Sequence, residues 1–365
     1  MLFIYTYNLL IIKVWLNEPL SMIQRLCETF RYADILNKAA KEPNPQLRLA
    51  YAACFCVVGY ELNIHRTTKF FNPVLGETFE YVDNELNCRY LGEQVSHHPA
   101  ISAMYAEGDG WHTYGNNNSK PTFNLFENTL EIEQVGKNYL SLFDFGDEIS
   151  WSKPKSYVRN IMFGEMYVET IGKTICNNHT NGDMIEITYH NVGGPKKPNF
   201  GMIDGYLKDL AGNEIMKITG NWSGTFDVVY KENGIEVKKN LWKHDPLPLS
   251  KEEWELRYNF SDFTINLNND DPTLLKTLPR NDSRLRPDQR ALEYGDLKLA
   301  ASEKHRIEEK QRARRKDEAK KKIIYKPLYF TETYDDLSGD LIYLYKKTYW
   351  ENKKNQNFAD APDIF

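Results

Sequence analysis

Two adjacent histidines, His97 and His98, stand in the segment LGEQVSHHPA (residues 91–100) and are followed directly by Pro99. Neighbouring imidazoles suit three kinds of chemistry: ligation of a metal, transfer of a proton during catalysis, and binding of an anionic group. Each kind needs different partner residues. The partners that the rest of the sequence supplies therefore decide between the three.

The sequence offers poor partners for a metal or for a catalytic nucleophile. Adjacent residues of a strand point to opposite faces, so only one histidine of the pair would ligate a metal easily. The nearest approach to a nucleophile elbow is residues 220–224 (GNWSG), whose serine stands one residue late for the G-x-S-x-G pattern. We predict no catalytic residue, no metal ligand and no cofactor. The remaining histidines form no ligand pattern; they are His65, His112, His179, His190, His244 and His305.

Side chains suited to an anion occur in two further segments. TKFFNPVLGETFEY (residues 68–81) places Lys69 and Asn72 just before a Pro and a Gly, in a turn that could present them at the mouth of a barrel. Lys304, Glu308 and Arg312 recur at i, i+4 and i+8, which keeps them within about 80° of one another on a helix. A phosphate is the partner that Lys, Arg and protonated imidazole share. The alternatives are an ordinary solvated turn and a surface ladder of ion pairs.

Three zones of different periodicity must position these residues. Residues 19–40 show helical spacing, and residues 47–60 are apolar on nearly every face, which predicts a buried helix. Short strands are predicted from about residue 69 to 267, where apolar and charged residues alternate, as in residues 130–133. So many antiparallel strands imply a large barrel or sandwich. After these strands the sequence again predicts helices, one of which is strongly charged and covers residues 302–322.

Composition excludes several classes of protein. The 365 residues contain no internal repeat and no low-complexity linker, which favours a single large domain. Five cysteines without zinc-type spacing indicate a reducing compartment. A net charge of -5 excludes a globally basic nucleic-acid binder, so no nucleic acid is expected as a partner. The apolar start, MLFIYTYNLLII, is too short to span a bilayer and lacks a signal-peptide cleavage site, which predicts a soluble or peripheral protein.

The segment EQVSHHPA is similar to the E-Q-V-S-H-H-P-P fingerprint of the oxysterol-binding protein-related family, which comprises lipid-transfer proteins of eukaryotic membrane contact sites. The resemblance extends over about residues 14–365. Five further segments resemble family segments and follow the family's order: NEPLSMIQRLCE (17–28), KFFNPVLGETFE (69–80), SRLRPDQRALEYGDL (283–297), EKHRIEEKQRARRK (303–316) and APDIF (361–365).

The resemblance implies a mainly β (α+β) fold, a large incomplete antiparallel β-barrel around a hydrophobic tunnel, with N-terminal and C-terminal helices. It also implies that residues 1–365 form one lipid-binding domain. The expected parts of this domain are a short or truncated lid (1–16), N-terminal helices (17–62), the barrel (63–270) and a C-terminal helical region and tail (271–365).

By the same resemblance, we expect a protein without enzymatic activity that exchanges phosphatidylinositol 4-phosphate for a sterol or another lipid, such as phosphatidylserine, between membranes. A lipid sensor without net transfer and a metal-dependent lipid hydrolase are the alternatives. The family pattern assigns the 4-phosphate to the histidine pair, the headgroup to the strand-turn segment, and the phosphates and an inositol hydroxyl to the charged helix. The expected phosphoinositide-binding residues are Lys69, Asn72, His97, His98, Lys304, Glu308 and Arg312.

Membrane contact is expected from the charged helix. Residues 303–322 hold ten Lys or Arg against five Asp or Glu, and anionic leaflets attract such clusters by about 1 kcal/mol for each basic residue near the surface. We predict docking through Arg314, Arg315 and Lys316, and a cytoplasmic protein that is peripheral at membrane contact sites. NFADAPD (residues 357–363) resembles the F-x-D-A core of motifs that bind an endoplasmic-reticulum receptor, a further expected partner.

Overall fold

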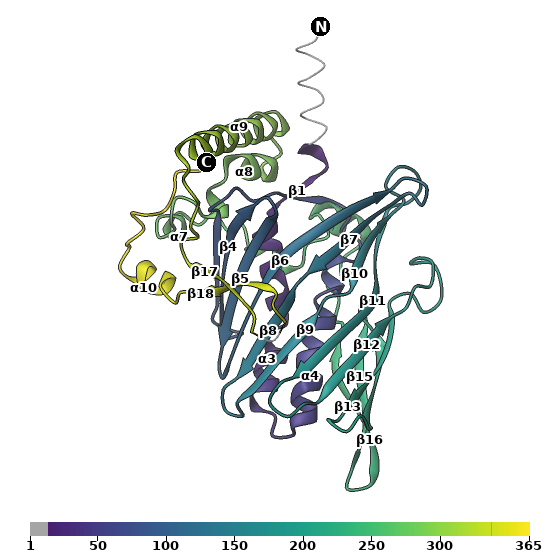
Figure 1. Ribbon diagram of the computed structural model, residues 1–365. Coiled ribbons are helices and arrows are strands. Elements are labelled where there is room, and N and C mark those ends of the chain that lie inside the picture. Colours follow the sequence, from purple (N-terminus) through teal and green to yellow (C-terminus); the bar gives the residue numbers. More distant parts are fainter. Residues whose placement is uncertain (1–13, 337) are drawn as a thin grey trace.

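The computed structural model describes residues 14–336 and 338–365 (Figure 1). The predicted lid, residues 1–16, therefore lies almost entirely outside the described residues. The main feature of the described part is a single antiparallel sheet. Its strands are β3 (Thr78–Asp83), β4 (Cys88–His97), β5 (Ala100–Gly108), β6 (Trp111–Asn124), β7 (Thr129–Val135), β8 (Lys137–Leu142), β9 (Asp147–Ser152), β10 (Lys155–Arg159), β11 (Tyr167–Asn178), β12 (Met184–Tyr189), β13 (Met202–Lys208), β14 (Glu214–Asn221), β15 (Thr225–Glu232) and β16 (Ile235–Lys243).

These 14 strands follow one another in the order of a meander. The order from one edge is β16-β15-β14-β13-β12-β11-β10-β7-β6-β5-β4-β3, while β8 and β9 join β6 to β11 by a second path. The edges β3 and β16 do not pair with each other in the described part of the chain, so the barrel is incomplete. The predicted fold class, mainly β with a large incomplete antiparallel barrel, is confirmed.

The alternation that predicted strands determines the faces of the sheet. In β7, Leu130 lies opposite Val158 of β10, on the same face as Ile132. On the other face, Glu131 accepts a hydrogen bond of 2.6 Å from the Lys155 ammonium. Because side chains alternate along a strand, a single register places the apolar residues on one face and the ion pair on the other.

The N-terminal helices pack on the inner face of the sheet. They are α2 (Met22–Cys27), η1 (Glu28–Tyr32), α3 (Ala33–Lys41), α4 (Pro45–Val58) and η2 (Glu61–Asn63). Asn44 begins α4, because its side chain accepts from the backbone N–H groups of Gln46 and Leu47 at 2.9 and 3.2 Å. Every residue from 47 to 58 is buried. The prediction of a buried helix is confirmed, and α4 contacts β9, β11, β12, β15 and β16.

The boundaries of the three zones differ from those predicted. Residues 17–21 form strand β1 (Asn17–Ser21), which pairs in parallel with β2 (Lys69–Phe71) outside the main sheet. The main sheet ends at Lys243, so residues 244–270 do not belong to the barrel. They hold α5 (Lys251–Leu256) and α6 (Asp262–Asn266), because Ser250 and Ser261 cap the first turns of these helices and override the local strand-like alternation.

The C-terminal region covers the outside of the sheet and one end of it. Its helices are α7 (Pro272–Leu275), η3 (Ser283–Leu285), α8 (Pro287–Glu293), α9 (Leu297–Lys321) and α10 (Tyr349–Lys354). The region also contains a hairpin, β17 (Phe330–Tyr334) and β18 (Leu341–Tyr345), where only helices and a tail were predicted. Among residues 14–336 and 338–365, no helix combines the length and apolar character needed to cross a bilayer.

A buried carboxylate, Glu93 of β4, holds the start of this C-terminal hairpin against the sheet. Glu93 accepts hydrogen bonds from the Tyr325 hydroxyl (3.0 Å) and from the backbone N–H groups of Leu328 (2.7 Å) and Tyr329 (2.8 Å). Burial raises the pKa of Glu93 to about 7, although the three donors act in the opposite direction. Glu93 therefore changes its charge near neutral pH.

The raised pKa of Glu93 predicts a pH dependence of stability. Between pH 4.5 and 7 the folded protein keeps a proton on Glu93 that the unfolded chain has released, so the free energy of unfolding falls as pH rises. Glu93→Gln lacks this contribution, which amounts to about 3 kcal/mol at most. We expect urea unfolding to show a larger loss of stability from pH 5 to pH 7.5 in the wild-type protein than in Glu93→Gln.

The exposed carboxylate Glu186 of β12 supplies the control for this comparison. Glu186→Gln should keep the wild-type pH dependence, because its ion pair with Lys173 lies on the surface. Identical pH dependence in the wild-type protein and Glu93→Gln would contradict the role given to Glu93.

Candidate functional site

The two histidines of the fingerprint lie at one end of the sheet. His97 is the last residue of β4, and His98 is in the turn that leads to β5. Their ring centroids are 4.5 Å apart, with an interplanar angle of 47°. The expectation that the two side chains point to opposite faces is wrong, because the strand ends at His97 and the turn brings the second ring round beside the first. Both imidazoles are therefore available to the same ligand.

Gln311 of α9 joins this turn to the helix. Its side-chain oxygen accepts a hydrogen bond of 2.9 Å from the Leu75 N–H, which directs the amide nitrogen toward His97. Gln311 Nε2 lies 3.0 Å from His97 Nε2. The same amide nitrogen lies 3.4 Å from His97 Nδ1. Because an amide N–H donates only to an unprotonated ring nitrogen, this contact favours a neutral His97 ring. The sequence reasoning missed Gln311, although its spacing of i+7 from Lys304 places it on the same helical face.

The electrostatic surroundings keep His97 neutral before an anion binds. Burial lowers the pKa of His97 to about 4, and the charges of His98 and Arg315 act in the same direction. His97 is half-buried, whereas His98 is exposed. A dianionic ligand beside His97 would oppose these effects and favour protonation of its ring. His97 is therefore placed to gain charge when an anion arrives.

The charged helix carries the predicted ladder along α9. The Lys304 ammonium forms an ion pair with Glu308, and Arg312 Nη2 lies 3.9 Å from Glu308 Oε2. Arg312 forms a second ion pair with Glu309. The surface ladder of ion pairs considered as an alternative is thus present in the structure. These pairs are partly exposed and weak, so a stronger anion could replace Glu308 as the partner of both cations.

Lys69 meets this ladder from the strand side. The Lys69 side chain is accessible to solvent, but neighbouring protein atoms partly desolvate its ammonium, and this burial lowers its pKa. The Lys304 ammonium lowers the pKa further, while Glu308 raises it. Asn17 fixes the strand by donating to the Lys69 carbonyl at 3.0 Å. The predicted helix and strand residues are therefore brought together at one place.

Asn72 is held in the turn that follows β2. Its side chain is exposed, and its carbonyl accepts a hydrogen bond of 2.9 Å from the buried Arg286. Arg286 also pairs with Glu77 at 2.9 Å and with Asp288 at 2.8 Å. Because these three charged groups are buried together, the SRLRPDQ segment acts as a rigid support for the turn. The turn that carries Asn72 therefore depends for its position on Arg286, which lies far from it in the sequence.

The three predicted membrane-docking residues have different surroundings. Arg314 forms an ion pair of 2.8 Å with Glu318 and lies over the Tyr325 ring. Arg315 is half-buried, and its charge contributes to lowering the pKa of His97. Lys316 is exposed. The structure thus groups Arg315 with the histidines and leaves Lys316 as the freest cation of the three.

The tail that resembles a receptor-binding motif is packed against the domain. Ala361 is buried, and its carbonyl accepts a hydrogen bond of 2.6 Å from Arg280. The Lys310 ammonium of α9 binds Asp363 at 2.6 Å and the Phe365 carbonyl at 2.7 Å. These contacts hold residues 357–365 in place and leave receptor binding by the tail without structural support.

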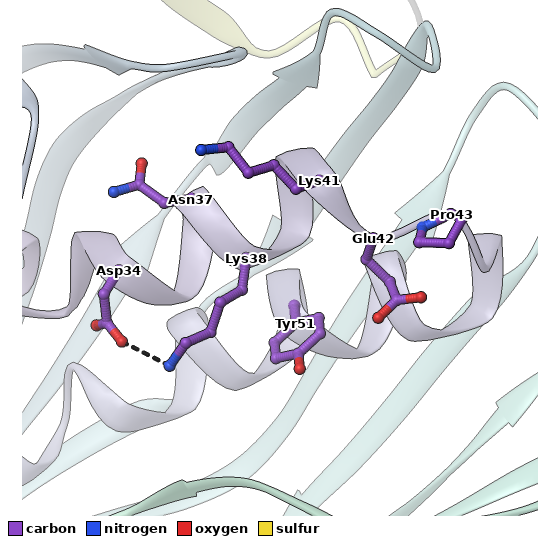
Figure 2. Close-up of a pocket in the computed structure, with 7 residues that line it drawn as sticks. All are labelled: Asp34, Asn37, Lys38, Lys41, Glu42, Pro43 and Tyr51. Atoms are coloured by element: carbon purple, nitrogen blue, oxygen red, sulfur yellow. Dashed lines mark hydrogen bonds and ion pairs between the residues drawn. The ribbon is translucent and has the colours of Figure 1, made fainter.

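A hollow of about 480 Å³ lies elsewhere, between α3 and α4 (Figure 2). Its lining residues are Asp34, Asn37, Lys38, Lys41, Glu42, Pro43 and Tyr51. The charges in it are already paired, as in the 2.8 Å contact of Lys38 with Asp34 and the 3.2 Å contact of Lys41 with Asp109. None of the predicted headgroup residues lines this hollow, and we assign it no function. Within the described ranges, no three His, Cys, Asp or Glu side chains are grouped so as to hold a metal ion.

Known proteins resemble this chain along nearly its whole length. A family model described as oxysterol-binding protein matches residues 10–354. Oxysterol-binding protein homolog 1 of Saccharomyces cerevisiae is 33% identical over 383 residues, covering 98% of this chain and 32% of that protein. Oxysterol-binding protein-related protein 6 of Homo sapiens is 35% identical over 357 residues, covering 96% of this chain and 37% of that protein. The chain thus spans about a third of the length of these relatives.

Solved structures show the same fold with lipids bound. The crystal structure of the Osh1 ORD domain in complex with cholesterol matches this chain with a TM-score of 0.87 and 32% identity. The match covers 96% of this chain and 85% of the Osh1 chain. The Osh3 ORD of Saccharomyces cerevisiae, in complex with PI(4)P, matches this chain with a TM-score of 0.80 and 25% identity. This match covers 96% of this chain and 90% of the Osh3 chain. By family model, sequence identity and fold, this chain belongs to the oxysterol-binding protein family.

Proposed function

We propose that this domain is a lipid carrier that binds phosphatidylinositol 4-phosphate and exchanges it for a sterol between membranes. The observation that carries the proposal is the meeting of the histidine turn, the strand-turn segment and α9 at one end of the sheet. Solved relatives at 25–32% identity bind cholesterol and PI(4)P. Both lipids join an apolar body to a polar head, a single hydroxyl in cholesterol and a charged inositol phosphate in PI(4)P. This suits a sheet with an apolar inner face and a polar end.

The proposed headgroup chemistry follows from the contacts that these side chains make with one another. A phosphomonoester is nearly a dianion and forms charge-assisted hydrogen bonds worth about 1.5–3 kcal/mol each. Lys304 and Arg312 would exchange Glu308 for the phosphate, and Glu308 would then be free to accept from an inositol hydroxyl. Lys69 and Asn72 would approach from the opposite wall, with His97 and His98 contacting the 4-phosphate.

The proposal assigns no chemical step to the protein. Binding and release are sufficient for exchange, so we infer a carrier without enzymatic activity, working at the cytoplasmic surfaces of membrane contact sites. Lys316 and the neighbouring cations of α9 would dock anionic membranes. Phosphatidylserine is the second candidate for the exchanged lipid. A sensor that binds lipid without net transfer is the remaining alternative.

A transfer assay between two liposome populations tests this function. One population contains phosphatidylinositol 4-phosphate and the other contains a fluorescent sterol. We expect the protein to move both lipids in opposite directions, each accelerating the movement of the other. Binding of both lipids without acceleration of transfer would identify a sensor, and release of free phosphate or inositol phosphate would identify an enzyme. Either result would overturn the proposal.

A further inference from the structure

Two neighbouring loops expose large apolar side chains at the end of the sheet that carries the histidine turn. We call them the apolar tips: residues 125–128, between β6 and β7, and residues 160–166, between β10 and β11. Phe126 is fully exposed, and Phe163 is 70% exposed. Other exposed apolar residues in or beside the tips are Phe123, Leu125, Met162 and Met166. A cluster of this kind on the surface marks a site of interaction.

The apolar tips are braced, so their exposure is a property of an ordered structure. Asn128 is buried and links the two loops: it accepts from the backbone N–H of Met162 at 2.7 Å and donates to the Phe163 carbonyl at 2.8 Å. The backbone N–H of Ile161 also donates to the Asn128 carbonyl at 3.2 Å. These bonds satisfy backbone groups of the second loop, so that its apolar side chains can leave water without stranding those polar groups.

The tips project beyond the histidine turn. The last residue of β6 that pairs with β5 is Asn118, whereas pairing of β6 with β7 continues to Asn124. At about 3.3 Å per residue, the β6–β7 hairpin extends roughly 20 Å, measured along the strand, past the first residues of β5. In Figure 1 the β6–β7 turn occupies the upper right corner, and α9 lies at the upper left of the same end. The end that binds the headgroup is thus flanked by basic residues on one side and apolar tips on the other.

The charges near the tips favour a lipid surface. Each tip contains one carboxylate, and both are paired: Glu127 lies 3.9 Å from Arg159, and Glu165 lies 2.7 Å from Lys196. Lys197 is exposed beside Lys196 in the following loop. Convex apolar side chains bordered by cations are the pattern that lies at the boundary between lipid headgroups and acyl chains.

We propose that the apolar tips insert into the bilayer surface and turn the headgroup-binding end toward it. This inference rests on the proposed lipid-carrier function, because a carrier must present its entrance to the membrane. The partner is the lipid bilayer itself, held by apolar insertion at the tips and by charge at α9. The apolar part persists at high salt, whereas the contribution of the α9 cations weakens.

A fluorophore at the tip tests insertion directly. All five cysteines are buried, so Phe126→Cys provides a single accessible site for an environment-sensitive NBD label. Ile235→Cys is the matched control, because Ile235 is 69% exposed in the β15–β16 turn at the opposite end of the sheet. On vesicles of phosphatidylcholine and phosphatidylserine we expect a several-fold, blue-shifted increase at position 126 and none at position 235. No increase at position 126, or equal increases at both, would overturn the inference.

A charged double variant separates this inference from the proposed function. Phe126→Asp with Phe163→Asp should reduce vesicle binding at high salt at least tenfold and slow lipid transfer, while short-chain phosphatidylinositol 4-phosphate in solution binds as before. Ile235→Asp should change neither property. If the folded double variant binds vesicles normally, the tips do not insert into the bilayer and the inference fails. If the wild-type protein does not bind the short-chain lipid, the proposed function fails instead.

Discussion

Replacing His97 and His98 together by alanine is expected to abolish extraction of phosphatidylinositol 4-phosphate from liposomes and to leave the fold intact. The two rings lie 4.5 Å apart at the end of β4, where one is half-buried and the other exposed, so the core does not depend on them. Two charge-assisted hydrogen bonds to phosphate are worth about 3–6 kcal/mol in total, which corresponds to at least a hundredfold loss of affinity.

His305→Ala is the matched control for the double variant, since His305 is an exposed histidine of α9 that contributes to no predicted headgroup contact. Circular dichroism and thermal unfolding of both variants should match those of the wild-type protein. Normal extraction by a folded His97→Ala, His98→Ala protein would remove the histidine pair from the binding site.

Arg312→Glu should cause a loss of similar size from the helical wall. Arg312 is 63% exposed and shares Glu308 and Glu309 as partners, so its reversal costs little stability. The new carboxylate would stand with two others beside the incoming phosphate and repel it. We expect at least a hundredfold weaker binding in an extraction assay, with less than a twofold change in vesicle docking in high salt.

Arg306→Glu makes the same change of charge on the same helix, six residues earlier. Arg306 pairs with Glu303 and contacts none of the predicted headgroup residues, so this variant should extract lipid normally. Equal losses in Arg306→Glu and Arg312→Glu would show a general effect of charge on membrane encounter. In that case Arg312 would have no specific role at the headgroup.

Spacing in the sequence predicts which side chains are neighbours along a helix. The i, i+4, i+8 ladder from Lys304 to Arg312 depends only on helical geometry, and the structure shows it. Gln311 was missed because an uncharged amide gives no signal of its own until the Leu75 N–H and His97 are brought beside it. The contact between the two histidine rings could not be foreseen either, since it depends on where β4 ends.

Secondary structure, too, is predicted best where the pattern of apolar residues alone decides it. Alternation in residues 130–133 predicts a strand, and the all-apolar run over residues 47–60 predicts a buried helix; the structure shows both. The β17–β18 hairpin was missed, because it is held by tertiary contacts such as those of Glu93 with residues 325–329. The exposure of Phe126 also contradicts what its residue type suggests, and only the structure shows it.

The most direct test of the headgroup site is NMR of protein carrying ¹⁵N-labelled histidine. In the free protein the His97 ring should titrate with a pKa of about 4. On addition of short-chain phosphatidylinositol 4-phosphate, the ring nitrogens of His97 and His98 should shift and the pKa of His97 should rise, because an adjacent dianion stabilises imidazolium. His179 and His190 should not respond. Saturating binding of the lipid without any change in the His97 and His98 signals would contradict the headgroup site.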